Sequence, residues 1–101
     1  MGVPFLDLTA QYRALKAPID AAIEDVVEAQ QFILGPTVER FEAEAASWLG
    51  AGHAIGVASG TDALLLSLKA LELPAGSGVV VPSFTFFATA GAVWNAGLRP
   101  V

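Results

Sequence analysis

Two apolar runs that each lead into a helix-like run constrain the fold of this chain more than any other feature. The runs Ala54–Ala58 and Val79–Val81 have the composition of buried strands, and the second is β-branched throughout. The apolar residues of Thr61–Leu73 and of Phe84–Ala96, which follow them, predict helices. Strands that alternate with helices indicate an α/β fold in which the strands run parallel.

The first half of the chain predicts helices. Apolar residues at helical spacing follow Pro18 and alternate with acidic residues, which is typical of an amphipathic helix. Because proline is tolerated in the first turn of a helix and disfavoured inside one, either a new helix begins at Pro18 or one long helix kinks there. A further helix is expected to begin at Pro36 and to end at the glycines that follow Leu49.

The composition is more apolar than a domain of this size needs. Of 101 residues, 54% are hydrophobic and 15% are charged, whereas average chains carry about 25% charged residues. Since a small domain has a large surface relative to its volume, the excess indicates apolar faces that more chain or a second subunit covers. Leu98–Val101 resembles the approach to a further strand, so we expect the N-terminal part of a longer protein.

Charge and missing residue types exclude several classes of function. The net charge of -5 and the scattered basic residues argue against nucleic-acid binding. Without cysteine and with one histidine, His53, the chain cannot form disulfides, thiol-based active sites or histidine-rich metal sites. The sequence has no secretory signal and no apolar stretch of the ~18 residues needed to cross a bilayer, so we expect a cytoplasmic protein without membrane contact.

The turn Ser59–Asp62 is the first candidate site. The amide groups in the first turn of a helix have no partner within the helix, and the helix dipole favours an anion beside them. Gly60 would let a ligand come close to the backbone, and the Thr61 hydroxyl could donate to a phosphate oxygen. The alternative is ordinary helix capping, since serine, threonine and aspartate are all favoured at helix starts.

Three phenylalanines, Phe84, Phe86 and Phe87, follow the second apolar run and form the second candidate site. Ligands bind beyond the carboxyl ends of parallel strands, and an aromatic side chain there can stack on a flat ring. The alternative is that all three are core residues. In a helix that starts at Phe84, Phe84 and Phe87 share a face, so Phe86 is the best candidate for stacking.

The apolar loop Phe32–Pro36 is the third candidate site. Its side chains either fill a local core or contact a partner subunit, and the residues alone favour neither. His53 is expected to be structural. Lys16 and Lys69 are not expected to act as nucleophiles, since neither pattern predicts the desolvated, partnered setting that activates a lysine.

Taken together, these segments resemble the DegT-type sugar aminotransferases, pyridoxal-phosphate enzymes that build amino sugars on nucleotide diphosphates. The resemblance covers nearly the whole chain, in order and at matching spacing. The ordered set is more specific than any single piece. The matching pieces are Val3–Leu8, Phe32–Pro36, Val38–Glu42, His53–Leu64 and Val81–Thr89.

The resemblance implies an aspartate-aminotransferase-like fold, called fold type I. Residues 1–101 would form the N-terminal part of its large domain, which binds the cofactor. In that family the positions of Gly60, Thr61 and Asp62 bind the phosphate of pyridoxal 5′-phosphate. The position of Phe86 holds the aromatic side chain that stacks on the pyridine ring. These four residues are therefore the expected cofactor-binding residues.

The resemblance also places the loop that contains Phe32, Leu34 and Gly35 near the active site and the subunit boundary of a homodimer. The lysine that forms the Schiff base, the carboxylate that pairs with the pyridinium nitrogen and the small domain lie downstream in the family. We therefore expect no catalytic residue in this chain and no transamination by it alone. The family's first two strands are not neighbours, so Ala54–Ala58 and Val79–Val81 are not expected to pair.

The complete enzyme is expected to pass an amino group from glutamate or a similar donor to a keto sugar linked to a nucleotide. These residues do not separate such an enzyme from a dehydratase-type member of the same family, in which the downstream lysine is replaced. The alternative from another class is a small non-catalytic α/β module that binds a phosphorylated ligand or serves in assembly.

Overall fold

The computed structural model describes residues 2–101, whose contacts form two compact units. The first unit extends to Ala54, and the second comprises Ile55–Val101. Helices make up the first unit, while the second alternates helices with short parallel strands. The predicted combination of helices and parallel strands is therefore confirmed in the second unit.

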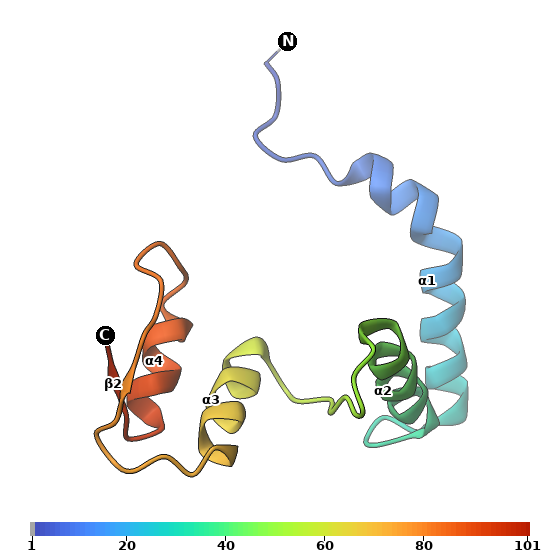
Figure 1. Cartoon of the computed structure of the whole chain (residues 1–101). Helices are drawn as coiled ribbons and strands as arrows, with labels where there is room; N and C mark the ends of the chain where they lie inside the picture. Colours follow the sequence, from blue (N-terminus) through green and yellow to red (C-terminus); the bar gives the residue numbers. More distant parts are fainter. Residues whose placement is uncertain (1) are drawn as a thin grey trace. The chain divides into compact units, whose positions relative to one another are not determined.

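The first unit contains the helices α1 (Thr9–Ala29) and α2 (Pro36–Leu49). Pro18 lies inside α1, so one long helix forms, and Figure 1 shows it bending along its N-terminal half. Proline removes a helical hydrogen bond and crowds the preceding turn, which accounts for a bend at this position. The alternative of a new helix that begins at Pro18 is wrong.

Helix α2 has the predicted bounds because its ends are encoded locally. Pro36 occupies its first turn, where the missing N–H costs nothing, and Gly35 precedes it in an extended conformation. Gly50 ends the helix in the left-handed region at φ 65°, and its amide donates to the carbonyl groups of Ala46 and Ser47. Ala46 is the buried apolar residue of this unit.

The second unit is built from α3 (Gly60–Ala70), β1 (Gly78–Val79), α4 (Ala88–Asn95) and β2 (Arg99–Pro100). The two strands run parallel, with Gly78 opposite Arg99 and Val79 opposite Pro100. Helix α4 packs against α3 and against β2. The fully or nearly fully buried apolar residues are Ala92, Val93 and Leu98.

The expected approach to a further strand is confirmed at the end of the chain. Hydrogen bonds extend the ladder beyond the two assigned strands, since the Val101 amide donates to Val79 over 2.9 Å and the Val81 amide donates to Val101 over 3.0 Å. The second apolar run therefore pairs with 98–101 and not with 54–58, as the resemblance implies.

The prediction of a strand at Ala54–Ala58 is wrong, because these residues form no strand in the structure. A strand is defined by a ladder to a neighbour, and the ladder among residues 2–101 joins only β1 and β2. The strand predicted at Val79–Val81 is assigned one residue earlier, at Gly78–Val79. The helix predicted over Thr61–Leu73 begins at Gly60 and ends at Ala70.

The helix predicted over Phe84–Ala96 begins four residues later, at Ala88. Residues 83–85 are bends, and the first hydrogen bonds of the helical turn are donated by Thr89 to Phe86 and by Gly91 to Phe87. The argument that Phe84 and Phe87 share a helix face therefore rested on a helix that does not form there. The alternative that the phenylalanines are core residues is also wrong, since Phe84, Phe86 and Phe87 are all exposed.

Candidate functional site

The start of α3 is a capped helix terminus with an extended residue before it. Ser59 adopts φ -159° and ψ 164°, and its hydroxyl oxygen accepts a hydrogen bond of 3.1 Å from the Asp62 amide. The same hydroxyl donates to the Asp62 carboxylate over 2.9 Å. Ser59 and Asp62 thus form the ordinary cap that the sequence left as an alternative.

This cap decides which groups of the turn can face an anion. The Asp62 amide is already engaged, and the Asp62 carboxylate would repel a phosphate. The amides of Gly60 and Thr61 occupy the first two helical positions, where no acceptor exists within the helix. An anion at this terminus would therefore meet these two amides and the exposed side chain of Thr61.

Gly60 is open to an approaching ligand. A Cβ atom built at Gly60 meets no heavy atom within 4 Å, and its φ lies outside the left-handed region. The fold of the chain therefore does not require glycine at this position. A glycine where the fold tolerates a side chain is consistent with close approach of another molecule to the backbone.

The aromatic loop follows β1 and leads into α4. The Phe86 side chain is 77% exposed, so its ring faces are open to a flat ligand. Phe87 is also exposed, but its ring lies beside Gly91, where an added Cβ would be 3.2 Å from ring atom Cε1. Phe84 is exposed as well, so exposure alone does not distinguish Phe86 from Phe84 as the stacking residue.

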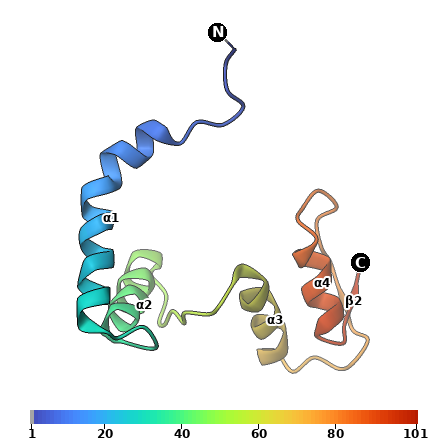
Figure 2. The same cartoon turned by 180° about the vertical axis from the view of Figure 1, so that it is seen from behind.

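The turn and the aromatic loop lie at the same end of the second unit. Figures 1 and 2 show α3 and α4 side by side and running in the same direction, so their N-terminal ends lie together. The chain that leaves β1 also turns at this end before it enters α4. The structure thus brings Gly60 and Thr61 to the end of the unit that carries Phe86.

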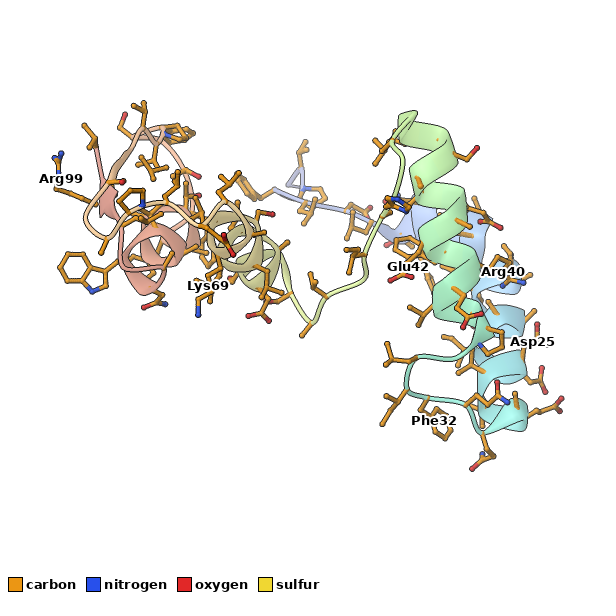
Figure 3. All side chains as sticks on the ribbon, turned by 60° about the horizontal axis from the view of Figure 1, so that its bottom comes forward. Asp25, Phe32, Arg40, Glu42, Lys69 and Arg99 are labelled. Atoms are coloured by element: carbon orange, nitrogen blue, oxygen red, sulfur yellow. The ribbon has the colours of Figure 1, made fainter. Side chains whose placement is uncertain are left out.

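The two basic side chains of the second unit lie elsewhere. Lys69 occupies the last turn of α3, at the opposite end from the Gly60 turn, and Arg99 belongs to β2. Figure 3 shows both side chains pointing outward from the ribbon. A phosphate at the turn would therefore be held by helix amides and a hydroxyl group, without a neighbouring cation from these two residues.

The loop between α1 and α2 presents its apolar side chains to solvent. Phe32, Ile33 and Leu34 are all more than half exposed, and Figure 3 shows Phe32 projecting from the loop. The local-core interpretation of this loop is therefore wrong. Gly35 is buried, and a Cβ there would lie 3.1 Å from the Gln31 carbonyl oxygen.

A threonine pair beside Phe86 was not anticipated. Oγ1 of Thr85 and Oγ1 of Thr89 lie 2.9 Å apart, at hydrogen-bonding distance. The signal that could have revealed the pair is the four-residue spacing of two threonines around a candidate stacking residue. The predicted helix from Phe84 would also have placed the two side chains near each other, since residues four apart are neighbours on a helix; the structure differs in that Thr85 lies in the loop before α4.

No helix formed by residues 2–101 combines the length and the apolar character that a bilayer span requires. In the same part of the chain, no group of three or more histidine, cysteine or acidic side chains is arranged to hold a metal ion.

His53 is exposed and lines a hollow with Glu39 and Glu42.

Residues 13–101 match the family model described as the DegT/DnrJ/EryC1/StrS aminotransferase family. The dTDP-3-amino-3,4,6-trideoxy-alpha-D-glucose transaminase of Streptomyces venezuelae is 48% identical over 99 residues, which are 98% of this chain and 26% of the relative. This chain therefore spans about a quarter of the length of the curated relatives it matches.

Solved structures show the same similarity. DesV of S. venezuelae, determined in complex with a ketimine intermediate, has a TM-score of 0.89 and 48% identity over 98% of this chain and 27% of its own. The E. coli GDP-4-keto-6-deoxy-D-mannose-3-dehydratase with bound hydrated PLP has a TM-score of 0.73 and 27% identity over 98% of this chain and 25% of its own. The expected fold, the N-terminal part of fold type I, is confirmed.

Proposed function

Because this chain belongs to the DegT/DnrJ/EryC1/StrS aminotransferase family, we propose that it serves a pyridoxal-phosphate-dependent aminotransferase that acts on a nucleotide-linked keto sugar. Residues 1–101 contribute part of the large, cofactor-binding domain. The amino donor is glutamate or a similar amino acid, and the product is an amino sugar. The observation that carries the proposal is the 48% identity to a nucleotide-sugar transaminase over nearly the whole chain.

The proposed cofactor-binding residues are Gly60, Thr61, Asp62 and Phe86, and their chemistry fits the cofactor. The Gly60 and Thr61 amides and the Thr61 hydroxyl donate to the phosphate at the positive end of α3. Asp62 contributes by closing the turn through Ser59, since its own amide and carboxylate are engaged there. Phe86 offers an exposed ring to the pyridine face. When bound, pyridoxal phosphate supplies the electron sink that amino-group transfer needs.

The loop with Phe32, Leu34 and Gly35 is proposed to lie at the subunit boundary of a homodimer, near the substrate. Exposed apolar side chains on a short loop support an interface, because such side chains gain free energy when a partner covers them. The net charge of -5 supports an enzyme that does not bind nucleic acid. A cytoplasmic location without membrane association completes the proposal.

Dehydratase chemistry is the alternative that has an observation in its favour. The E. coli dehydratase matches 98% of this chain at 27% identity. The proposed contacts to the phosphate and the pyridine ring of the cofactor would serve either reaction. A small non-catalytic module that binds a phosphorylated ligand is the third candidate. We favour the aminotransferase because the relative with that activity is 48% identical.

Binding of pyridoxamine 5′-phosphate to the full-length apoprotein that carries these residues tests the site. This ligand contains both the phosphate and the ring, and its fluorescence reports on stacking. Thr61→Val and Phe86→Ala are expected to weaken binding about tenfold or more, since each removes a direct contact. Phe84→Ala is the matched control, because Phe84 is an exposed phenylalanine of the same loop. Equal effects of Phe84→Ala and Phe86→Ala would contradict the site.

Reaction with substrates tests the activity. The full-length protein is incubated with glutamate, pyridoxal phosphate and nucleotide-linked keto sugars, and the sugar product is identified by mass spectrometry. A product that carries a new amino group supports the aminotransferase. A product that has lost water, with no nitrogen gained, supports the dehydratase instead, and an unchanged sugar with normal cofactor binding supports the non-catalytic module.

A further inference from the structure

Two threonine hydroxyl groups bracket Phe86 in the chain. Oγ1 of Thr85 lies 2.9 Å from Oγ1 of Thr89, and either atom can donate. The Thr89 amide donates a second hydrogen bond of 3.1 Å to the Phe86 carbonyl oxygen. Thr89 is therefore joined to Thr85 by a side-chain bond and to Phe86 itself by a backbone bond.

These bonds connect a loop to a packed helix. Thr85 belongs to the loop, while Thr89 lies in the first turn of α4. That helix is anchored by Ala92 and Val93, which are the most deeply buried side chains of the second unit. Thr85 is exposed and Thr89 is half-buried, so the hydroxyl pair is a solvent-accessible contact that links the loop to this helix.

An exposed ring needs such support if it is to stack. Phe86 is 77% exposed, so core packing does not set the direction of its ring. A binding site whose side chain is free to move must order it when the ligand binds, and this ordering weakens the affinity. Holding the backbone on both sides of Phe86 reduces the number of directions that the ring can take before the ligand arrives.

We propose that Thr85 and Thr89 are positioning residues, whose hydroxyl pair orients Phe86 toward the cofactor ring. The inference rests on the proposed function, since it names how the stacking residue of that site is held. Neither threonine has to touch the cofactor. The pair acts through the loop backbone and therefore affects stacking on the ring, while the phosphate contacts at Gly60 and Thr61 are independent of it.

The test compares two probes in the full-length apoprotein. Binding of pyridoxamine 5′-phosphate uses both the Gly60–Thr61 turn and the Phe86 ring, whereas binding of inorganic phosphate uses only the turn. Thr85→Val keeps the shape of the side chain and removes its hydroxyl, and Thr85→Ser keeps the hydroxyl. We expect Thr85→Val to weaken the affinity for pyridoxamine 5′-phosphate about three- to tenfold, as loss of one hydrogen bond predicts. The affinity for inorganic phosphate should be unchanged. Thr85→Ser should bind pyridoxamine 5′-phosphate with an affinity within about twofold of that of the unmodified protein.

Amide hydrogen exchange without ligand supplies a second readout. Thr85→Val should speed exchange at the Thr89 amide, and Thr85→Ser should not. Thr37→Val is the matched control, because Thr37 is an exposed threonine near the start of a different helix. It should change neither readout.

Equal loss of both probes in Thr85→Val, unchanged binding of both, or failure of Thr85→Ser to restore binding would each overturn the positioning role. If the unmodified protein binds neither probe, the proposed function fails and this inference fails with it. If the unmodified protein binds both probes and Thr85→Val binds each of them as tightly as the unmodified protein does, this inference alone fails.

Discussion

Replacing Gly60 with alanine should have opposite effects on stability and on ligand affinity. A Cβ at this position meets nothing within 4 Å, and the backbone is helical, so the methyl group fits without strain. Alanine also restricts the unfolded chain more than glycine does. Gly60→Ala should therefore raise the free energy of unfolding by about 0.4–1 kcal/mol.

The same methyl group should hinder a phosphate. A phosphate oxygen that accepts from the Gly60 amide must come within about 3 Å of that nitrogen, and the new Cβ is attached to the adjacent Cα. Loss of one hydrogen bond to a charged group costs about 1.5–3 kcal/mol. Gly60→Ala should therefore weaken the affinity for pyridoxamine 5′-phosphate about 10- to 150-fold, at about 1.4 kcal/mol for each factor of ten.

The assay pairs urea unfolding with a fluorescence titration of pyridoxamine 5′-phosphate, both on the full-length protein. Gly52→Ala is the matched control, because Gly52 is also exposed, also lies outside the left-handed region and also leaves a Cβ in open space. Gly52→Ala should raise the free energy of unfolding to a similar extent and leave the affinity for pyridoxamine 5′-phosphate unchanged. Unchanged affinity in Gly60→Ala would refute close approach of the phosphate to this residue, and a loss of stability would refute the open environment of Gly60.

Three further predictions concern the chain itself. Gly50→Ala should lower the free energy of unfolding by about 1–2 kcal/mol, since Gly50 adopts φ 65° at the end of α2; a stabilised variant in urea unfolding would contradict this. The Thr9 side chain and the Thr9 amide, which donates over 2.8 Å, lower the pKa of Asp7 below its usual value. The stabilisation of the α1 N-terminus is therefore present above the unfolded-state pKa of Asp7 and is lost as the pH falls through the lowered folded-state pKa. Asp7→Asn should remove this acid sensitivity from Thr9 amide exchange, and an Asp7 carboxyl that titrates at its ordinary value by NMR would argue against it. The isolated 101-residue chain should bind a hydrophobic dye and self-associate in sedimentation, because large apolar side chains such as Ile23, Phe32 and Trp94 are exposed; a monomer that unfolds cooperatively and binds no dye would count against this.

Features that depend on neighbouring residues in the chain were predictable. Pro36 at the start of α2 and Gly50 at its end act through their own backbone preferences, which no distant contact has to supply. Ser59 and Asp62 form a cap with each other across three residues. The turn that carries Gly60 and Thr61 could therefore be placed at a helix start from the sequence.

Features that depend on distant partners were not predictable to the same degree. Ala54–Ala58 has the composition of a strand, but hydrogen bonds to a neighbouring strand make a strand, and β1 pairs with β2 instead. The exposure of Phe86 and of the Phe32 loop depends on what packs around them, which periodicity does not report.

The sequence by itself determined the helix ends, the Gly60 turn and the family to which the chain belongs, since each rests on residue identity and short spacing. Only the tertiary structure decided that α3 and α4 run side by side, so that Gly60, Thr61 and Phe86 lie at one end of the second unit. It also decided that the loop before α4 is not helical, which makes the contact between Thr85 and Thr89 a link from the loop to the helix. The physical reason is that packing between helices and pairing between strands join residues far apart in the chain, and no local preference specifies which of them meet.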